Sequence, residues 1–452
     1  MFRLFDTATG QVRPLELRDP GAVSVYLCGP TVYDLPHLGH GRHALVWDVL
    51  RRYLEWTGLR VRFVSNITDV DDNIIRRAEE EGRSEAAVAT EFEGTWYDAL
   101  DALGVRRPTV DPHATAYIPQ MVELVGELVA RGAAYELDDG VYLDTGRVPG
   151  YGLLARQPLD SLRAGSRVEV DASKRSPRDF VLWKRAKPGE PSWESPWGAG
   201  RPGWHTECVV MSLDLLGEGF DLHAGGQDLA FPHHENERAQ AVALGRPFAR
   251  HWSHHAFVVA KGGEKMSKSL GNFTSLSDLL ARQDPRAYRL LVLRAHYRSP
   301  LEVTPGTISD AEGGLARLDS LARRMPEGAR SGTADAAAMD DFRAAMDDDL
   351  DTPRVVALLF DLVRRTNTAL DAGADADAAG PWAAIEEISG ALGLEVSAGD
   401  EASGADVEAL VTRRDEARAA RDFAAADAAR DELVALGWVV EDTPAGTRVR
   451  RA

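Results

Sequence analysis

Cysteine is scarce in this chain, since Cys28 and Cys208 are the only two among 452 residues. This count excludes the disulfide framework on which small secreted proteins depend. Two interpretations of the pair remain open. The thiols are either inert and buried, as free cysteines often are, or they are two ligands of one metal ion that takes its other ligands elsewhere in the chain.

Long hydrophobic runs are also missing. No stretch reaches the roughly 18 consecutive apolar residues that a membrane-spanning helix needs. The N-terminal segment MFRLFDTATGQVRPLEL lacks the apolar core of a signal peptide. We therefore expect a cytoplasmic protein that makes no membrane contact.

Positive charge is in short supply, with 52 Lys and Arg against 71 Asp and Glu and a net charge of −19. This balance excludes a protein that coats nucleic acid without specificity, although a local basic face is enough to bind one RNA. Positions 371–412 hold no Lys or Arg, whereas eight arginines lie between 413 and 451. Acidic residues interleave with these arginines, and this tail is the candidate basic face.

The chain is too long for one hydrophobic core, and we expect about two to four domains. Near the N-terminus, VSVYLCGP predicts a buried strand that ends at Gly29-Pro30. ALVWDVLRRYLEWTG then has helical spacing up to Gly58, and RVRFVSNIT alternates like a strand. A strand, a helix and a strand in this order predict a βαβ unit and a parallel sheet.

The rest of the chain changes character several times. Residues 79–131 have an amphipathic helical pattern, and residues 134–179 hold short strand-like pieces that indicate an insertion. The four prolines between 184 and 203 predict a loop. Sheet-like segments return at 220–226 and 254–260, and nearly everything beyond Thr304 is predicted to be helical.

Two short motifs carry the candidate chemistry. His37-Leu38-Gly39-His40 lies where a strand turns into a helix, so its imidazoles and the free N–H groups of the helix start could stabilise a phosphate. Gly39 would let a nucleotide approach the backbone. A metal-binding or a purely capping role for these histidines remains open. In Lys265-Met266-Ser267-Lys268-Ser269, two lysines in a glycine-bounded loop could reach leaving phosphates, and a solvated basic loop is the alternative.

The two motifs together resemble the signatures of class I aminoacyl-tRNA synthetases. The strings CGPTVYD, NITDVDDNII, PGWHTEC, GGQDLAFPHHENE and GEKMSKSLGN are similar to cysteinyl-tRNA synthetases in particular. The tail RDFAAADAARDELVALGWVVEDTPAGT is similar to the C-terminal segment of that family. The likeness therefore extends over nearly the whole chain.

The resemblance implies an α/β fold with a Rossmann-like parallel sheet. The catalytic domain would span residues 1–305, with a connective insertion at about 110–203 and the KMSKS-loop region at about 253–305. An α-helical, DALR-like anticodon-binding domain would follow at 306–398, and a small mixed tRNA-recognition domain at 405–452.

The resemblance also implies a metal site. FPHHENERAQAVALG has a helical pattern, so His233 and Glu237 lie four residues apart on one face. The family binds one Zn²⁺ per chain through the residues matching Cys28, Cys208, His233 and Glu237. Two thiolates, one imidazole and one carboxylate form a plausible tetrahedral zinc site. His234 is the nearest competitor of His233, and a buried His–Glu pair without metal is the alternative.

Zinc would explain how cysteine is told from serine. The two side chains are nearly isosteric, and accuracy calls for a factor of roughly 10⁴ to 10⁵, or about 5.5–7 kcal/mol. A thiophilic cation binds a thiolate far better than an alcohol. Cys28 and Trp204 would therefore contribute to the substrate pocket, although a core position is the commoner one for Trp.

The remaining site residues are expected around ATP. His37, His40, Lys265 and Lys268 would stabilise the phosphates, with Mg²⁺ expected from the chemistry of ATP. Gly226 and Asp228 match the adenosine-binding segment of the family, and Asp228 could accept hydrogen bonds from ribose hydroxyls. The NITDVDDNII segment also holds three aspartates, Asp69, Asp71 and Asp72. They could bind magnesium, but we favour a structural role in capping the helix that follows.

The implied activity is a two-step ligation of L-cysteine to tRNA-Cys with ATP by a monomeric enzyme. Two departures from the family pattern stand out, His255-Ala256 where Asn-Gly is common and Val449 where an aromatic is common. Two alternative functions remain. One is the mycothiol-pathway ligase, which passes cysteine to an amino sugar and lacks the C-terminal module; the other is a catalytically inactive, synthetase-like RNA-binding protein.

Overall fold

The structure is a computed structural model, and it describes residues 1–156, 173–259, 275–398, 404–436, 438–443 and 446–451. Two compact units divide the chain. The first comprises Met1–Leu321 and Met325–Val396, and the second comprises Ala322–Arg324 and Ser397–Ala452.

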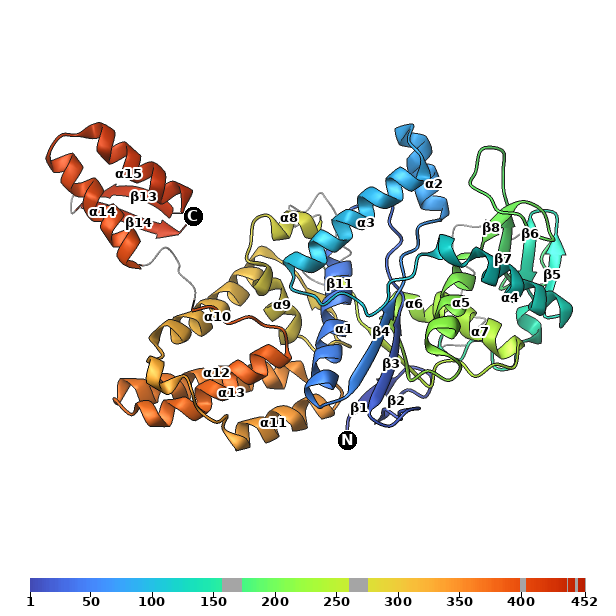
Figure 1. Cartoon of the computed structure of the whole chain (residues 1–452), viewed down its shortest axis with the longest axis horizontal. Helices are drawn as coiled ribbons and strands as arrows, with labels where there is room; N and C mark the ends of the chain where they lie inside the picture. The colour runs from blue at the N-terminus through green and yellow to red at the C-terminus, as the bar shows by residue number, and fades with distance from the viewer. Residues whose placement is uncertain (157–172, 260–274, 399–403, 437, 444–445, 452) are drawn as a thin grey trace. The chain divides into compact units, whose positions relative to one another are not determined.

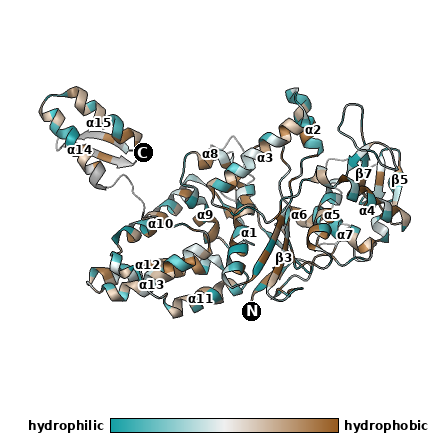
Figure 2. Cartoon of the chain, in the orientation of Figure 1, coloured by the Kyte–Doolittle hydropathy of each residue, from teal (hydrophilic) through white to brown (hydrophobic). Residues whose placement is uncertain are grey.

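A parallel sheet of four strands forms the centre of the first unit, in the order β10-β9-β3-β4. Strand β3 consists mainly of buried apolar residues, as the brown colour around it shows in Figure 2. This composition is typical of a parallel sheet that is covered on both faces. The bounds are β3 (Ala22–Leu27), β4 (Arg60–Ser65), β9 (Leu222–Gly226) and β10 (His251–His255).

The predicted βαβ unit is confirmed. Helix α1 (Leu38–Trp56) joins β3 to the parallel strand β4 and packs against it (Figure 1). It begins at Leu38, six residues before the predicted helical run, because His37 and His40 cap its first turn. The other helices and strands around the sheet are α2 (Asp72–Glu81), α3 (Glu85–Ala102), α5 (Trp204–Leu216), α6 (Gln227–Leu229), α7 (Glu235–Ala243), α8 (Leu276–Leu280), α9 (Pro285–Arg294), β1 (Arg3–Asp6), β2 (Gln11–Pro14), β11 (Val258–Val259) and β12 (Leu301–Glu302).

An insertion with its own antiparallel sheet separates the two halves of the parallel sheet. It contains α4 (Ile118–Ala130) and the strands β5 (Ala134–Leu137), β6 (Gly140–Leu143), β7 (Phe180–Arg185) and β8 (Gly200–Pro202). The prediction of a continuous loop over 184–203 was wrong at its ends. β8 pairs with β7 despite its proline, because β8 is an edge strand that needs donors on one side only.

The chain beyond Thr304 is largely helical, as predicted. In the first unit these helices are α10 (Pro305–Arg324), whose last three residues are grouped with the second unit, α11 (Ala336–Asp347), α12 (Thr352–Asp371) and α13 (Asp375–Ala391). The second unit contains α14 (Gly404–Ala419), α15 (Phe423–Ala435) and an antiparallel hairpin of β13 (Trp438–Thr443) and β14 (Gly446–Arg451). A search of the described helices for a span that could cross a membrane finds none.

Candidate active site and metal centre

The site lies at the carboxyl ends of β3 and β9. In the sheet, β3 and β9 are neighbours, and their chain continuations go to opposite sides, toward β4 and β10 respectively. Such a switch point opens a crevice beyond the strand ends, where ligands of doubly wound sheets bind. Cys28 follows β3 directly and Gly226 ends β9. The fold therefore brings together segments separated by about two hundred residues of chain.

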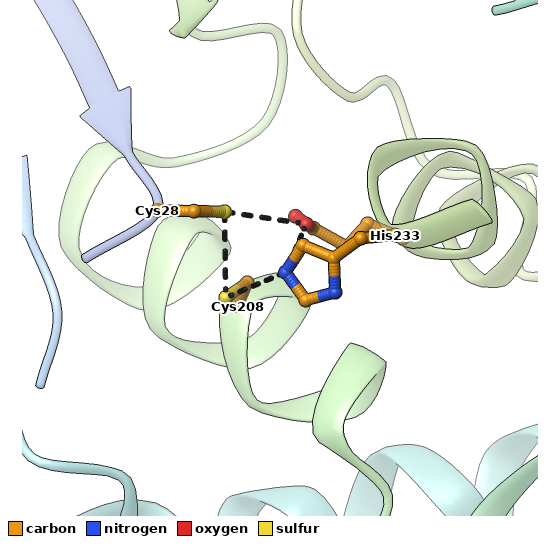
Figure 3. Close-up of side chains that lie close together, drawn as sticks. Cys28, Cys208 and His233 are labelled. Atoms are coloured by element: carbon orange, nitrogen blue, oxygen red, sulfur yellow. Dashed lines mark hydrogen bonds and ion pairs between the residues drawn. The ribbon is translucent and has the colours of Figure 1, made fainter. Parts of the chain in front are cut away.

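Four side chains converge in this crevice, and we call them the Cys2HisGlu cluster: Cys28, Cys208, His233 and Glu237. Their ligand atoms all lie within 4.8 Å of one another, and all four residues are buried. Figure 3 shows Cys28 at the end of its strand facing Cys208 on a helix, with the His233 ring turned toward the sulfur. The cysteines are free, because their sulfurs are 3.6 Å apart.

The distances within the cluster fit a tetrahedral metal site. Ordinary zinc–ligand bond lengths give tetrahedral edges of about 3.8 Å between two sulfurs, about 3.6 Å between sulfur and nitrogen or oxygen, and about 3.4 Å between nitrogen and oxygen. The matching distances are 3.6 Å for the sulfurs, 3.4 Å from Cys28 Sγ to Glu237 Oε1, 3.6 Å from Cys208 Sγ to His233 Nε2, and 3.1 Å from His233 Nε2 to Glu237 Oε1. The donor set and its spacing are compatible with a bound metal ion.

A second layer of histidines orients the ligands. His205 Nδ1 lies 2.8 Å from His233 Nδ1, and His223 Nε2 lies 2.7 Å from Glu237 Oε2. Each contact fixes the atom that faces away from the cluster, as outer partners of metal ligands do. Burial raises the pKa of the Cys28 thiol well above its ordinary value and also raises that of Cys208. Two thiolates in this place therefore need a cation to balance their charge.

His234 belongs to a second possible set, with Cys28, His223 and Glu237. Its Nδ1 lies 2.9 Å from His254 Nε2, and its Nε2 has no hydrogen-bond partner in the part of the chain that the structure describes. In that set His223 Nε2 lies 2.7 Å from Glu237 Oε2. We favour the first set, because its four distances given above match edges of a zinc tetrahedron.

The two histidines of the first motif both cap α1 and face a cavity. His37 Nδ1 accepts a hydrogen bond from the backbone N–H of His40, and His40 Nδ1 accepts one from that of His37, each at 3.2 Å. The rings stack with centroids 3.7 Å apart. Because both Nδ1 atoms are acceptors, the proton of each neutral imidazole sits on Nε2. Burial lowers the pKa of His37 and brings that of His40 to about 3, so both are neutral N–H donors at physiological pH.

The cavity has a volume of about 360 Å³ and extends from the capping motif to Cys28 of the Cys2HisGlu cluster. Its lining includes His37, Gly39 and His40 on one side, and Cys28 and Trp204 beside the cluster. The Trp204 side chain is 39% exposed and stacks on His233 with centroids 4.0 Å apart. A core position for this tryptophan was the wrong alternative, and the ring forms a wall of the cavity.

Glycine at position 39 is required by the cap. A Cβ added there would meet the His37 ring at 2.8 Å, closer than real contacts allow. Gly226 and Asp228 also line the cavity, and a Cβ at Gly226 would meet Asp228 Oδ1 at 2.5 Å. Asp228 is exposed to the cavity, so its carboxylate is available to hydroxyl donors of a ligand.

The three aspartates of the NITDVDDNII segment have structural partners. Asp71 caps α2 by accepting a 2.8 Å bond from the Asn73 backbone, which confirms the capping interpretation. Asp69 accepts hydrogen bonds from Thr115. Asp72 forms ion pairs with Lys184 and Arg201. All three carboxylates are thus engaged within the protein.

Sequence reasoning missed several residues of the site. His43 lies one helical turn after His40 and lines the same cavity, a position that the helical spacing could have indicated. His255 also lines it and contacts His43 at 3.1 Å. His205 and His223 carried no recognisable signal, because their partners are distant in sequence. Lys265 and Lys268 lie outside the described residues.

The buried histidines of β10 make stability depend on pH. Burial lowers the pKa values of His254 and His255 to about 3, whereas in the unfolded chain they stay near about 6.5. The unfolded chain therefore binds more protons as the pH falls below about 6.5, and the native state loses stability down to about pH 3. We expect a loss of up to about 1.4 kcal/mol per pH unit for each histidine.

Urea unfolding at pH 7 and pH 5.5 measures this loss. His255→Asn removes one titrating group, and we expect it to reduce the pH slope by up to about 1.4 kcal/mol per unit. A variant with the same slope as the unchanged protein would show that His255 does not contribute.

Comparison with protein families gives three matches along the chain. Residues 14–313 match the class I (C) tRNA synthetase catalytic domain, and residues 341–397 match the DALR domain. Residues 400–450 match the cysteinyl-tRNA ligase anticodon binding domain. The predicted boundaries after residues 305 and 398 stay predictions, since these matches overlap the expected domains without fixing their limits.

Curated relatives match over the whole length. A cysteine–tRNA ligase of Halorhodospira halophila is 46% identical over 461 residues, covering 100% of both chains. One of Streptomyces coelicolor is 44% identical and covers 99% of this chain and 75% of its own. Among solved structures, a methionyl-tRNA synthetase of Mycobacterium tuberculosis in complex with methionyl-adenylate has a TM-score of 0.60 at 15% identity, covering 86% of this chain and 94% of its own. That likeness supports the class I fold.

Proposed function

The chain belongs to the cysteine–tRNA ligase family of class I aminoacyl-tRNA synthetases, and from this premise we propose that a zinc ion held by its Cys2HisGlu cluster selects the cysteine substrate. The enzyme uses ATP, L-cysteine and tRNA. The observation that supports the zinc proposal best is the near-tetrahedral spacing of four buried donors, one of which, Cys28, lines the same cavity as the HLGH motif.

Zinc, when bound, supplies a thiophilic Lewis acid that prefers a thiolate to an alcohol. The protein's own residues supply shape and orientation around it. His205 and His223 hold the ligands His233 and Glu237 in place, and the Trp204 ring closes the cavity beside them. Cysteine would thus be bound with its sulfur at the cluster and its carboxylate toward the nucleotide.

Adenylation places the cysteine carboxylate against the α-phosphate of ATP. His37 and His40 donate their Nε2 protons toward the phosphates, where negative charge develops as pyrophosphate leaves. Asp228 and Gly226 bind the adenosine, with the aspartate accepting from ribose hydroxyls. Lys265 and Lys268 complete the phosphate contacts, with Mg²⁺ on ATP. No side chain acts as a covalent nucleophile, so positioning and charge stabilisation account for the rate.

The cysteinyl group then passes to the ribose of the 3′ adenosine of tRNA-Cys. We propose that residues 306–398 and 405–452 recognise this tRNA, that the enzyme works as a cytoplasmic monomer, and that residues 1–305 carry the chemistry. The match of residues 400–450 to the anticodon binding domain favours tRNA over an amino-sugar acceptor. Full-length identity to cysteine–tRNA ligases disfavours a catalytically inactive, RNA-binding protein.

Two assays on one preparation test the proposed function. Zinc-loaded protein is assayed for cysteine-dependent exchange of pyrophosphate into ATP. It is then assayed for transfer of cysteine to tRNA-Cys and, in parallel, to glucosaminyl-inositol, the amino-sugar acceptor of the mycothiol pathway. We expect exchange with cysteine and transfer to the tRNA alone. Transfer to the sugar alone would overturn the choice of acceptor, and the absence of exchange would overturn the activity.

Lys268→Ala addresses the loop lysines. We expect a slower adenylation step with little change in cysteine affinity, because a point charge on the leaving phosphates acts mainly in the transition state. Single-turnover formation of cysteinyl adenylate measures the step. An unchanged rate would remove Lys268 from the proposed phosphate contacts.

A further inference from the structure

A buried arginine on α1 has no role in the mechanism above. Arg42 follows the HLGH motif by two residues, and its side chain is fully buried. No carboxylate among the described residues forms an ion pair with it, and its Nε has no partner there. Burial lowers the pKa of Arg42 to about 10, which leaves the guanidinium charged at physiological pH. Burying a cation without a counter-ion costs free energy, so other polar groups must solvate the guanidinium.

Four backbone carbonyls solvate this guanidinium. Nη1 donates to Phe257 O at 2.7 Å, and Nη2 donates to Ser299 O at 2.6 Å and Tyr297 O at 3.1 Å, with His296 O at 3.3 Å. The acceptors belong to two separate stretches of chain. One leads into β11, and the other joins α9 to β12. The planar guanidinium carries several donors in a fixed fork, so it can bind both stretches at once.

The stretch that leads into β11 forms part of the rim of the nucleotide cavity, and the second stretch is bonded to it. β11 and β12 pair in parallel, and the Leu301 N–H donates to the same Phe257 carbonyl that Arg42 binds. Phe257 and Val258 line the cavity, and the Phe257 side chain is 48% exposed. The cavity lining also includes His40 and His43, which stand on α1 beside Arg42. Arg42 therefore ties the helix that carries the phosphate donors to another part of the same lining.

We propose that Arg42 is a positioning residue that sets the width of the nucleotide cavity by fixing the Phe257–Val258 rim against α1. This inference rests on the proposed function, since it assigns the cavity to ATP. The arginine touches no substrate and acts through the backbone that it holds. Loosening it should weaken the fit to ATP while leaving the cysteine end of the cavity, at Cys28 and Trp204, unaffected.

Arg289 provides a matched control. It is also a buried arginine, 1% exposed, and it donates to the carbonyls of Leu103, Gly104 and Leu392. In addition it pairs with Asp48 at 2.7 Å. It does not line the cavity or bind its rim. Loss of its guanidinium should disturb packing to a similar degree without a selective effect on ATP.

The test compares Arg42→Lys with Arg289→Lys. Lysine keeps the charge but lacks the fork, so it cannot reach both stretches of backbone. In pyrophosphate exchange we expect Arg42→Lys to raise the KM for ATP by at least about tenfold, as the loss of one charge-assisted hydrogen bond would give. The KM for cysteine should stay within about twofold. Arg289→Lys should leave both KM values unchanged, and thermal unfolding of both variants reports their packing.

Each outcome bears on the proposal. A selective rise in the KM for ATP in Arg42→Lys alone supports it. Equal changes for ATP and cysteine, or no change in a folded Arg42→Lys protein, overturn it, as does failure of Arg42→Lys and Arg42→Gln to fold under conditions where Arg289→Lys folds. Absence of exchange in the unchanged protein would instead count against the proposed function, so the two failures are distinguishable.

Discussion

Cys208→Ser should abolish both metal binding and cysteine activation. The hydroxyl that replaces the thiol is not ionised near neutral pH, and zinc prefers a thiolate strongly to an alcohol. The remaining three donors would be left around a buried site with one corner open. Since changes in outer partners alone cost about 10- to 100-fold in metal affinity, loss of a direct ligand should exceed that. We expect cysteine-dependent pyrophosphate exchange to fall by at least about 10³-fold.

Metal analysis and the exchange assay on the same preparation measure this result. Ser212→Ala is the matched control, because Ser212 lies one turn further along α5, is fully buried, and donates its hydroxyl to the Val209 carbonyl. This control should retain one zinc per chain and near-normal exchange. Stoichiometric zinc and normal exchange in Cys208→Ser would refute the ligand assignment.

His40→Ala should slow adenylation by about 10² to 10³, the usual effect of removing one donor from a site of developing negative charge. The Nε2 proton of His40 is free to face the cavity, because its Nδ1 accepts from the His37 backbone. The effect should fall on the adenylation rate more than on the KM for ATP, since the donor acts mainly in the transition state. Some stability should be lost as well, because the ring helps to cap α1, and caps contribute about 0.5–2 kcal/mol.

Two comparisons separate these effects. His40→Asn keeps a side-chain N–H donor and should recover part of the lost rate. His113→Ala removes a part-buried histidine that pairs with Glu93 and does not line the cavity, so its adenylation rate should be unchanged. Single-turnover adenylate formation is the measurement. A normal rate in His40→Ala would assign His40 to capping alone.

The sequence predicted those parts of the site that depend on local periodicity. Hydrophobic spacing and turn residues were enough for the β3–α1–β4 unit, and helical spacing placed His233 and Glu237 on one face. The structure shows that this face begins at a kink, since Phe231 has a non-helical backbone. His233 Nε2 still lies 3.1 Å from Glu237 Oε1, because helix α7 begins at Glu235, before the glutamate.

Contacts between distant segments were beyond the sequence. His205 and His223 each lack a local pattern, and their roles appear only when the fold sets them against His233 and Glu237. Arg42 is a stronger example, because it lies on a helix whose apolar pattern predicts burial but not its acceptors more than 200 positions away. A buried polar residue needs partners, yet the sequence alone does not name them.

We propose above all that the Cys2HisGlu cluster binds the sulfur of the amino acid through a metal ion. Cobalt substituted for zinc reports this directly, because each cobalt–thiolate bond contributes sulfur-to-metal charge-transfer absorption. Cys28 and Cys208 would supply two thiolates. Addition of L-cysteine should raise that absorption by about one half, because a third thiolate joins the metal, whereas L-serine should leave the absorption unchanged. An absorption that cysteine leaves unchanged in adenylation-competent protein would contradict the account.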